Sequence, residues 1–265
     1  MSSLQLNTEV AIERLPFSIA PTDRLLFVGS CFASEIGRRF ADAQFHTVVN
    51  PYGVMYNPAS ILHTVEKCEA ADVAVLTLGT NHVYILNETG EIVDNCCKRP
   101  QRLFTERVLT VTECTGYLQQ CIEKLRSFNP DVNVVLTVSP IRYRKYGFHG
   151  SQLSKAALLL ATDEIVRSNA GVAYFPAYEL MNDELRDYRF YKPDMLHPSE
   201  QAADYIFKRF CDAVLSDDAF RFMDEWQPIA HALNHKPFNP DSEEYKIFIE
   251  HAKERERQFR MKWKL

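Results

Sequence analysis

Four short apolar runs, separated by segments with helical spacing, constrain the fold of this chain more than any other feature of its sequence. The runs occupy residues 24–29, 72–79, 132–140 and 172–176. Their apolar residues follow one another almost without interruption, which is typical of strands that helices cover on both faces. Strands that alternate with helices in this way predict a parallel sheet with right-handed crossovers. We therefore expect an α/β fold, a three-layer α/β/α sandwich.

The length of the chain and the pattern after residue 215 predict its domain organisation. An α/β domain of the expected size fits residues 1–215 of the 265. Residues 216–265 have the pattern of two more helices, interrupted at "KPFNP", and the second is dense in Glu, Lys and Arg. We expect this C-terminal helical extension to pack on or near the α/β domain.

Charge and hydropathy argue against several classes of protein. The formal net charge of -5 disfavours general nucleic-acid binding, which needs a surplus of Lys and Arg to displace counterions from phosphates. No signal-peptide pattern is present, and no window approaches the roughly 18 to 20 apolar residues that span a bilayer. Seven scattered cysteines show no metal-site or disulfide spacing. We expect a cytoplasmic protein with no membrane contact, nucleic-acid partner, metal or other cofactor; its oligomeric state is not predicted.

The segment "GSCFASEIG", residues 29–37, directly follows the first apolar run. It places the hydroxyl of Ser30 beside the thiol of Cys31 at a predicted strand-to-helix corner, where a nucleophile can be presented. A serine there is also a preferred helix N-cap, whose side-chain oxygen accepts a hydrogen bond from an otherwise unpaired backbone N–H. The corner by itself is therefore consistent with a nucleophile or with a helix cap.

Polar residues also follow the later runs. "GTNH", residues 79–82, ends the second run, "SPIRYRK" ends the third, and "YKPDMLHPSE" supplies Asp194 and His197. In open α/β sheets, ligands bind beyond the carboxyl ends of the strands, where helix N-termini converge. We therefore expect a nucleophile, an amide and an imidazole on one rim, as acyl transfer requires.

Each of these groups has a defined task in acyl transfer. Ser30 needs a base to take its proton, and His197 is of the residue type that does so near neutral pH. Asp194, three residues before His197, is close enough on a turn to accept a hydrogen bond from Nδ1–H and to orient the imidazole. Asn81 is the expected side-chain oxyanion donor, alongside the backbone N–H groups of Ser30 and Gly53.

A basic cluster of Arg142, Arg144 and Lys145 follows the third run. It either holds an anionic part of the substrate, with Arg142 as the substrate-binding residue, or forms a solvated face. The histidines show no HxH or HExxH spacing, which argues against a metal site.

Five ordered blocks resemble the GSCFA family, which is placed among the SGNH-type hydrolases. The blocks are "LFVGSCFASEIGRRF", "NPYGVMYNP", "TLGTNHVY", "TVSPIRY" and "DELRDYRFYKPDMLHPSEQAADYIF". The resemblance covers the chain from about residue 15 to 250, including "HKPFNPDSEEYKIFI". It implies a flavodoxin-like sandwich with Ser30 as nucleophile and Cys31 packed behind the corner. Asp194 and His197 match the terminal Asp-x-x-His block, and Gly53 matches the glycine of the second block.

Together the residues and the resemblance predict a serine esterase or acylhydrolase that cleaves a small acyl ester. Ser30 forms the acyl-enzyme, and water activated by His197 releases the acid. Analogy with the wider fold suggests a small-molecule or carbohydrate ester as substrate. Two alternatives stay open: an acyltransferase that uses the same residues, and a non-catalytic member that binds a glycan or a protein partner through the same rim.

Overall fold

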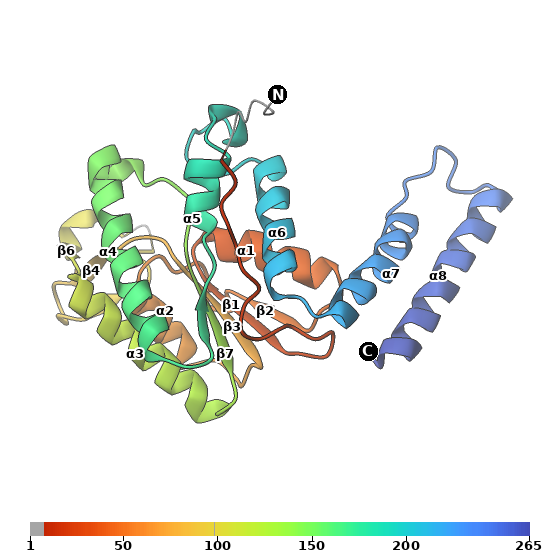
Figure 1. Cartoon of the computed structure of the whole chain (residues 1–265). Coiled ribbons are helices and arrows are strands. Elements are labelled where there is room, and N and C mark those ends of the chain that lie inside the picture. Colours follow the sequence, from red (N-terminus) through yellow and green to blue (C-terminus); the bar gives the residue numbers. More distant parts are fainter. Residues whose placement is uncertain (1–7, 98) are drawn as a thin grey trace, which may run out of the picture.

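The computed structural model describes residues 8–97 and 99–265, and it contains the expected parallel sheet (Figure 1). The five strands lie in the order β2-β1-β3-β7-β8, and every neighbouring pair is parallel. Their bounds are Leu25–Gly29 for β1, Thr47–Val49 for β2, Val73–Leu78 for β3, Asn133–Val138 for β7 and Val172–Tyr174 for β8. This is the strand order of flavodoxin-like folds, so the predicted fold class is confirmed.

Helices cover both faces of this sheet, which explains why its strands are apolar almost throughout. Successive residues of a strand point to opposite faces. Leu25 and Phe27 of β1 belong to one core, whereas Leu26 and Val28 belong to the other. The first core is closed by α1 Cys31–Asp42 and α6 Glu200–Val214, and the second by α2 Pro58–Val65, α3 Val111–Phe128 and α4 Gly147–Ser168. The molecule is thus the predicted three-layer sandwich.

A second, antiparallel sheet follows β3 and was not predicted. Its strands are β4 His82–Leu86, β5 Ile92–Val93 and β6 Phe104–Val108, in the order β5-β4-β6. They are short and partly exposed, so their sequences lack a long apolar run. Several short helices connect the main elements: η1 Gln101–Leu103, η2 Arg144–Tyr146, α5 Ala177–Glu179, the π-helical η3 Leu180–Glu184 and η4 Tyr188–Phe190.

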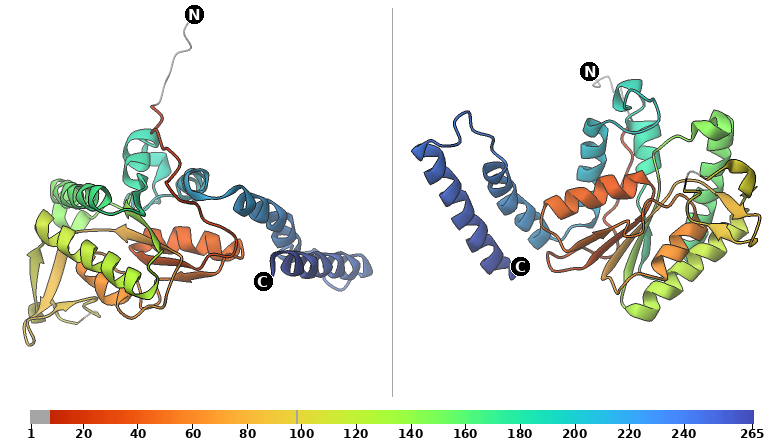
Figure 2. Two further views of the ribbon diagram at one scale, coloured as in Figure 1. Left: turned by 60° about the horizontal axis from the view of Figure 1, so that its bottom comes forward. Right: turned by 180° about the vertical axis from the view of Figure 1, so that it is seen from behind.

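The two predicted C-terminal helices are α7 Asp217–Leu233 and α8 Glu243–Trp263, which project from the β2 side of the sheet (Figure 2). They are attached to the sandwich by aromatic packing. The ring of Phe222 lies 5.0 Å from that of Phe45, and Trp226 Nε1 donates a hydrogen bond to Asp42 O at 2.7 Å. In residues 8–97 and 99–265, none of the helices combines the length and the apolar character that crossing a bilayer requires.

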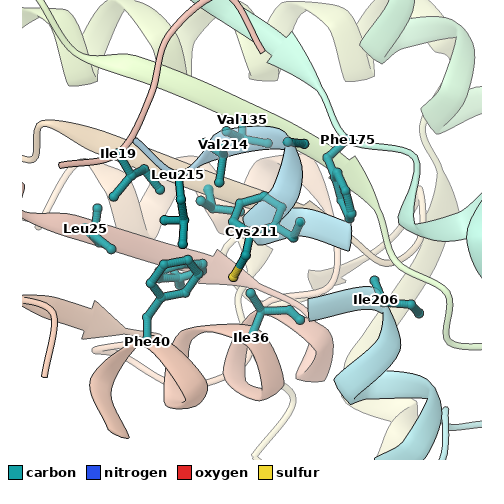
Figure 3. Packing of buried hydrophobic residues seen from close by; sticks show 14 of the residues in the cluster. Ile19, Leu25, Ile36, Phe40, Val135, Phe175, Ile206, Cys211, Val214 and Leu215 are labelled. Atoms are coloured by element: carbon teal, nitrogen blue, oxygen red, sulfur yellow. The ribbon is translucent and has the colours of Figure 1, made fainter. Parts of the chain in front are cut away.

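The segment before β1 is held by residues from near the other end of the sandwich. Ile19 is completely buried and forms a parallel bridge with Leu215. Ile19 N donates to Val214 O at 2.7 Å, and Leu15 N donates to Ala213 O at 2.9 Å. Figure 3 shows Ile19 and Leu215 above Leu25 of β1 in the first core. The chain ahead of the sheet is therefore placed by the end of α6.

Candidate active site

Ser30 lies at the junction of β1 and α1 and caps the helix. Its Oγ accepts a hydrogen bond from Phe32 N at 3.2 Å and lies 3.3 Å from Thr77 Oγ1. Its backbone N–H donates to Thr77 O at 3.1 Å. The residue is 0% exposed. The sequence predicts that the Ser30 hydroxyl attacks the substrate and that its N–H binds the oxyanion. In the structure, both groups already make hydrogen-bond contacts within the protein.

Cys31 follows Ser30 at the same corner and is the first residue of α1. It is partly exposed, and its Sγ lies 3.9 Å from the hydroxyl oxygen of Tyr56. Cys31 also packs against the first core, so it lies partly behind the corner, as expected. Capping explains the difference between the two residues, because an N-cap serine turns its Oγ toward the helix N–H groups. The next side chain lies about 100° further around the helix, and here it is partly exposed.

Two tyrosine hydroxyls lie near the Cys31 thiol. Burial, followed by the adjacent Cys31 thiol, raises the pKa of Tyr56 to about 12. The ring of Tyr143 stands edge-on to that of Tyr56, with centroids 6.1 Å apart. Its buried hydroxyl has no hydrogen-bond partner among the residues that the structure describes. Burial, then the neighbouring Tyr56 and Cys31, holds the pKa of Tyr143 well above its usual value. Both phenols therefore stay protonated at neutral pH and remain hydrogen-bond donors.

The structure brings Asp194 and His197 together on the loop before α6. His197 Nδ1 lies 2.6 Å from Asp194 Oδ2, and Asp194 Oδ1 accepts hydrogen bonds from Leu196 N at 2.8 Å and His197 N at 3.0 Å. The backbone N–H of His197, then that of Leu196 and the imidazole, lowers the pKa of Asp194 to about 2. Met195 between them has a φ of +60°, a costly conformation for this residue type. The loop is therefore built to hold an ionised carboxylate against the imidazole.

Arg142 fixes this loop. Its guanidinium donates to Met195 O at 3.0 Å, and its backbone N–H donates to Leu196 O at 3.1 Å. The guanidinium also lies over the rings of Phe148, at 4.2 Å, and Tyr191, at 5.4 Å. The predicted substrate-binding arginine thus has extensive contacts within the protein.

A second contact connects the loop to α1. Lys192 Nζ lies 3.6 Å from the carboxylate of Glu35, one helical turn after Cys31. His197 O accepts a hydrogen bond from Lys192 N at 2.7 Å. The Asp194–His197 loop is therefore held beside the first turns of α1. Within residues 8–97 and 99–265, no hydrogen bond joins the imidazole to Ser30 or to Cys31.

The other two predicted oxyanion donors make different contacts. Asn81 is 3% exposed, and its Nδ2 donates to Leu109 O at 2.7 Å. Gly53 lies in an exposed turn with a φ of +96°, and its N–H donates to Asn50 O at 2.9 Å. Asn81 thus connects the end of β3 to the segment before α3, and Gly53 shapes the turn after β2. Because both groups already donate hydrogen bonds within the protein, neither is available to a substrate in this arrangement.

Lys155 on α4 is a buried lysine that the sequence analysis did not single out. It is 1% exposed, and its Nζ donates to Gly79 O and Ser139 O, both at 2.7 Å. These carbonyls follow β3 and β7, so the Lys155 amine joins the ends of two neighbouring strands. Burial lowers the pKa of Lys155 to about 7. The available signal was its spacing of three residues from Leu158 on the apolar face of the helix.

A cavity of about 390 Å³ adjoins Tyr56, between the rim and the second sheet. Its aromatic lining consists of Tyr56, His82, Tyr84, Phe104, Tyr143 and Tyr146. The imidazole of His82 stacks on Tyr146 at 3.6 Å and is hydrogen-bonded to Glu106 at 2.9 Å. Lys145 also contacts Glu106, at 3.1 Å. Among the described residues, no group of three or more His, Cys, Asp or Glu is placed to hold a metal ion.

Comparisons with known proteins cover most of the chain. Two solved structures with similar chain arrangements are carbohydrate esterases. One, of family 3 from Talaromyces cellulolyticus, is 12% identical with a TM-score of 0.44, and the match covers 76% of this chain and 99% of that one. The other, of family 2 plus a carbohydrate binding domain from Corynascus thermopiles, is 14% identical with a TM-score of 0.44, and the match covers 75% and 68%. No curated protein matches the sequence.

Family profiles give the assignment. The profile of the GSCFA family matches residues 24–70 and 63–210, and the profile of the GSCFA domain protein, C-terminal domain, matches residues 226–264. The first of these spans the sheet, the corner after β1 and the loop before α6. The chain belongs to the GSCFA family.

Proposed function

We propose that this protein hydrolyses acyl esters at the rim between the corner after β1 and the Asp194–His197 loop. The observation that carries the proposal is the 2.6 Å contact between His197 Nδ1 and Asp194 Oδ2. A carboxylate on Nδ1 orients the imidazole and leaves Nε2 as the basic atom. The contact between Lys192 and Glu35 keeps this pair beside the start of α1, where the nucleophile is expected.

The reaction has two acyl-transfer steps. His197 Nε2 takes the proton of the nucleophile, which attacks the acyl carbonyl, and the alcohol leaves with that proton. Water then gives a proton to His197 and attacks the acyl-enzyme, which releases the acid. The corner offers two nucleophiles, the Ser30 hydroxyl that the sequence predicts and the Cys31 thiol. The aromatic cavity beside Tyr56 suits the organic part of a small ester, and a carbohydrate as its alcohol remains a prediction.

Steady-state hydrolysis of p-nitrophenyl acetate by purified variants tests this proposal. His197→Ala should lower kcat/KM by about 100- to 10,000-fold, because general-base catalysis contributes about that much. Asp194→Asn should also lower kcat/KM strongly, because the carboxylate no longer stabilises the imidazolium. The matched control is His251→Ala, which removes an exposed histidine of α8 and should leave the rate unchanged. Equal catalysed rates for wild type, His197→Ala and Asp194→Asn would place the hydrolysis elsewhere, and a wild-type rate no higher than the uncatalysed one would indicate a binding protein.

A further inference from the structure

We propose that Cys31, not Ser30, is the nucleophile, so that the acyl-enzyme is a thioester; this inference rests on the proposed ester hydrolysis. The first argument is access. Ser30 is 0% exposed and its Oγ is committed to Phe32 N and Thr77 Oγ1. Cys31 is partly exposed, and its Sγ lies 3.9 Å from the hydroxyl oxygen of Tyr56. Attack by Ser30 Oγ would require the helix cap to open, whereas Cys31 needs no such change.

The second argument is the supply of hydrogen-bond donors around the sulfur. The first N–H groups of a helix have no intrahelical acceptor, and the N-terminal end of a helix favours negative charge. Cys31 is the first residue of α1, so its own N–H is placed next to its side chain. The Tyr56 hydroxyl lies 3.9 Å from Sγ. These are the donors that a carbonyl oxygen needs as it becomes negatively charged.

The third argument is the orphaned hydroxyl of Tyr143. It is buried, lacks a partner among the described residues, and belongs to a ring packed edge-on against Tyr56. A buried polar group without a partner is costly, so its retention here points to a ligand atom that completes the hydrogen bond. Tyr56 and Tyr143 also line the aromatic cavity. The two rings thus border the cavity on the side of Tyr56, whose hydroxyl lies beside Cys31.

The chemistry balances without any further reactant. His197 Nε2 removes the thiol proton, and the sulfur forms a bond to the acyl carbon. The ester C–O bond breaks, and the alkoxide leaves with the proton from the imidazolium. In the second step water transfers a proton to His197 and its oxygen attacks the thioester. The C–S bond then breaks, and the thiolate regains the proton.

The test is the chemical identity of the trapped acyl group. The full-length chain is mixed with p-nitrophenyl esters from acetate to octanoate, quenched with acid during the burst, and analysed by intact mass and peptide fragmentation. Neutral hydroxylamine cleaves thioesters readily and leaves oxygen esters largely intact. We expect one acyl group on Cys31 that hydroxylamine removes. Cys31→Ala should abolish it, and Cys31→Ser should abolish its sensitivity to hydroxylamine.

Two controls keep the result interpretable. Ser30→Gly removes the hydroxyl with little loss of capping, and we expect it to retain the hydroxylamine-sensitive adduct. Cys68→Ser removes another partly buried thiol, in a separate groove, and should change nothing. An acyl group on Ser30 that resists hydroxylamine would overturn the inference and leave ester hydrolysis intact. No adduct and no turnover with any ester would instead contradict the proposed function itself.

Discussion

Gly29 allows β1 to approach β3 closely at the point where the corner begins. Its φ is +139°, and a Cβ at this position would lie 2.1 Å from Thr77 O, a backbone atom that cannot move away. Gly29→Ala should therefore lower the free energy of unfolding by at least about 3 kcal/mol or prevent folding. Urea denaturation measures the change. The matched control is Gly116→Ala in α3, where a Cβ meets nothing, which should raise stability by about 0.5–1 kcal/mol. Similar effects of the two changes would contradict the geometry.

Lys155 gives a pH dependence of stability with a definite sign. Burial lowers its pKa to about 7 in the folded chain, whereas an unfolded lysine titrates near about 10.4. Between these values the unfolded chain binds more protons, so this contribution to stability rises with pH and is lost as pH falls toward 7. Relative to Lys155→Met, the wild type should gain about 1.4 kcal/mol per pH unit between about pH 7.5 and 9.5. A difference in unfolding free energy that stays constant with pH would rule this out.

For individual residues, the sequence was enough to predict that Asp194 and His197 contact each other, but not the direction in which each side chain at the corner points. Asp194 and His197 are three residues apart, so local spacing was enough to predict their contact. The orientations of Ser30 and Cys31 depend on which of the two residues caps α1. The sequence "GSCFA" is compatible with either residue as the cap. The partners of Asn81 lie on segments that only the tertiary fold brings together.

The Asp194–His197 loop, between η4 and α6, is the element whose position the proposed reaction needs most. Arg142, from the segment after β7, holds it through Met195 O and through its own backbone N–H. Arg142→Ala should lower kcat about 10- to 100-fold with little change in KM, because the imidazole loses its support. Arg144→Ala, an exposed neighbour, is the control. A rise in KM alone would favour the predicted substrate-binding role of Arg142.

The elements that the sequence did and did not predict differ in burial. β1, β3 and β7 are buried on both faces and therefore read as continuous apolar runs. β2 has three residues at the sheet edge, and β4 to β6 are short and partly exposed. Their pairing is set by distant partners rather than by local pattern, so the second sheet and the cavity beside it could not be predicted.

For the molecule as a whole, both tryptophans of the chain, Trp226 and Trp263, lie in α7 and α8. Trp226 is 6% exposed and contacts the end of α1 through Asp42. Because these helices share the first core with the sheet, we expect the sandwich and the extension to unfold together. Tryptophan fluorescence and far-UV circular dichroism should give the same urea midpoint. An earlier fluorescence transition would show that α7 and α8 detach first.

The pairing of Ile19 with Leu215 affects the order in which this protein can assemble during translation. Residues 15–19 emerge from the ribosome early, but the carbonyl groups that receive their N–H groups belong to residues 213 and 214. Residues 15–19 therefore lack these hydrogen-bond partners until the whole sandwich has been synthesised. A nascent chain that stalls before the end of α6 therefore exposes both the apolar side chain of Ile19 and the core surface that it later covers.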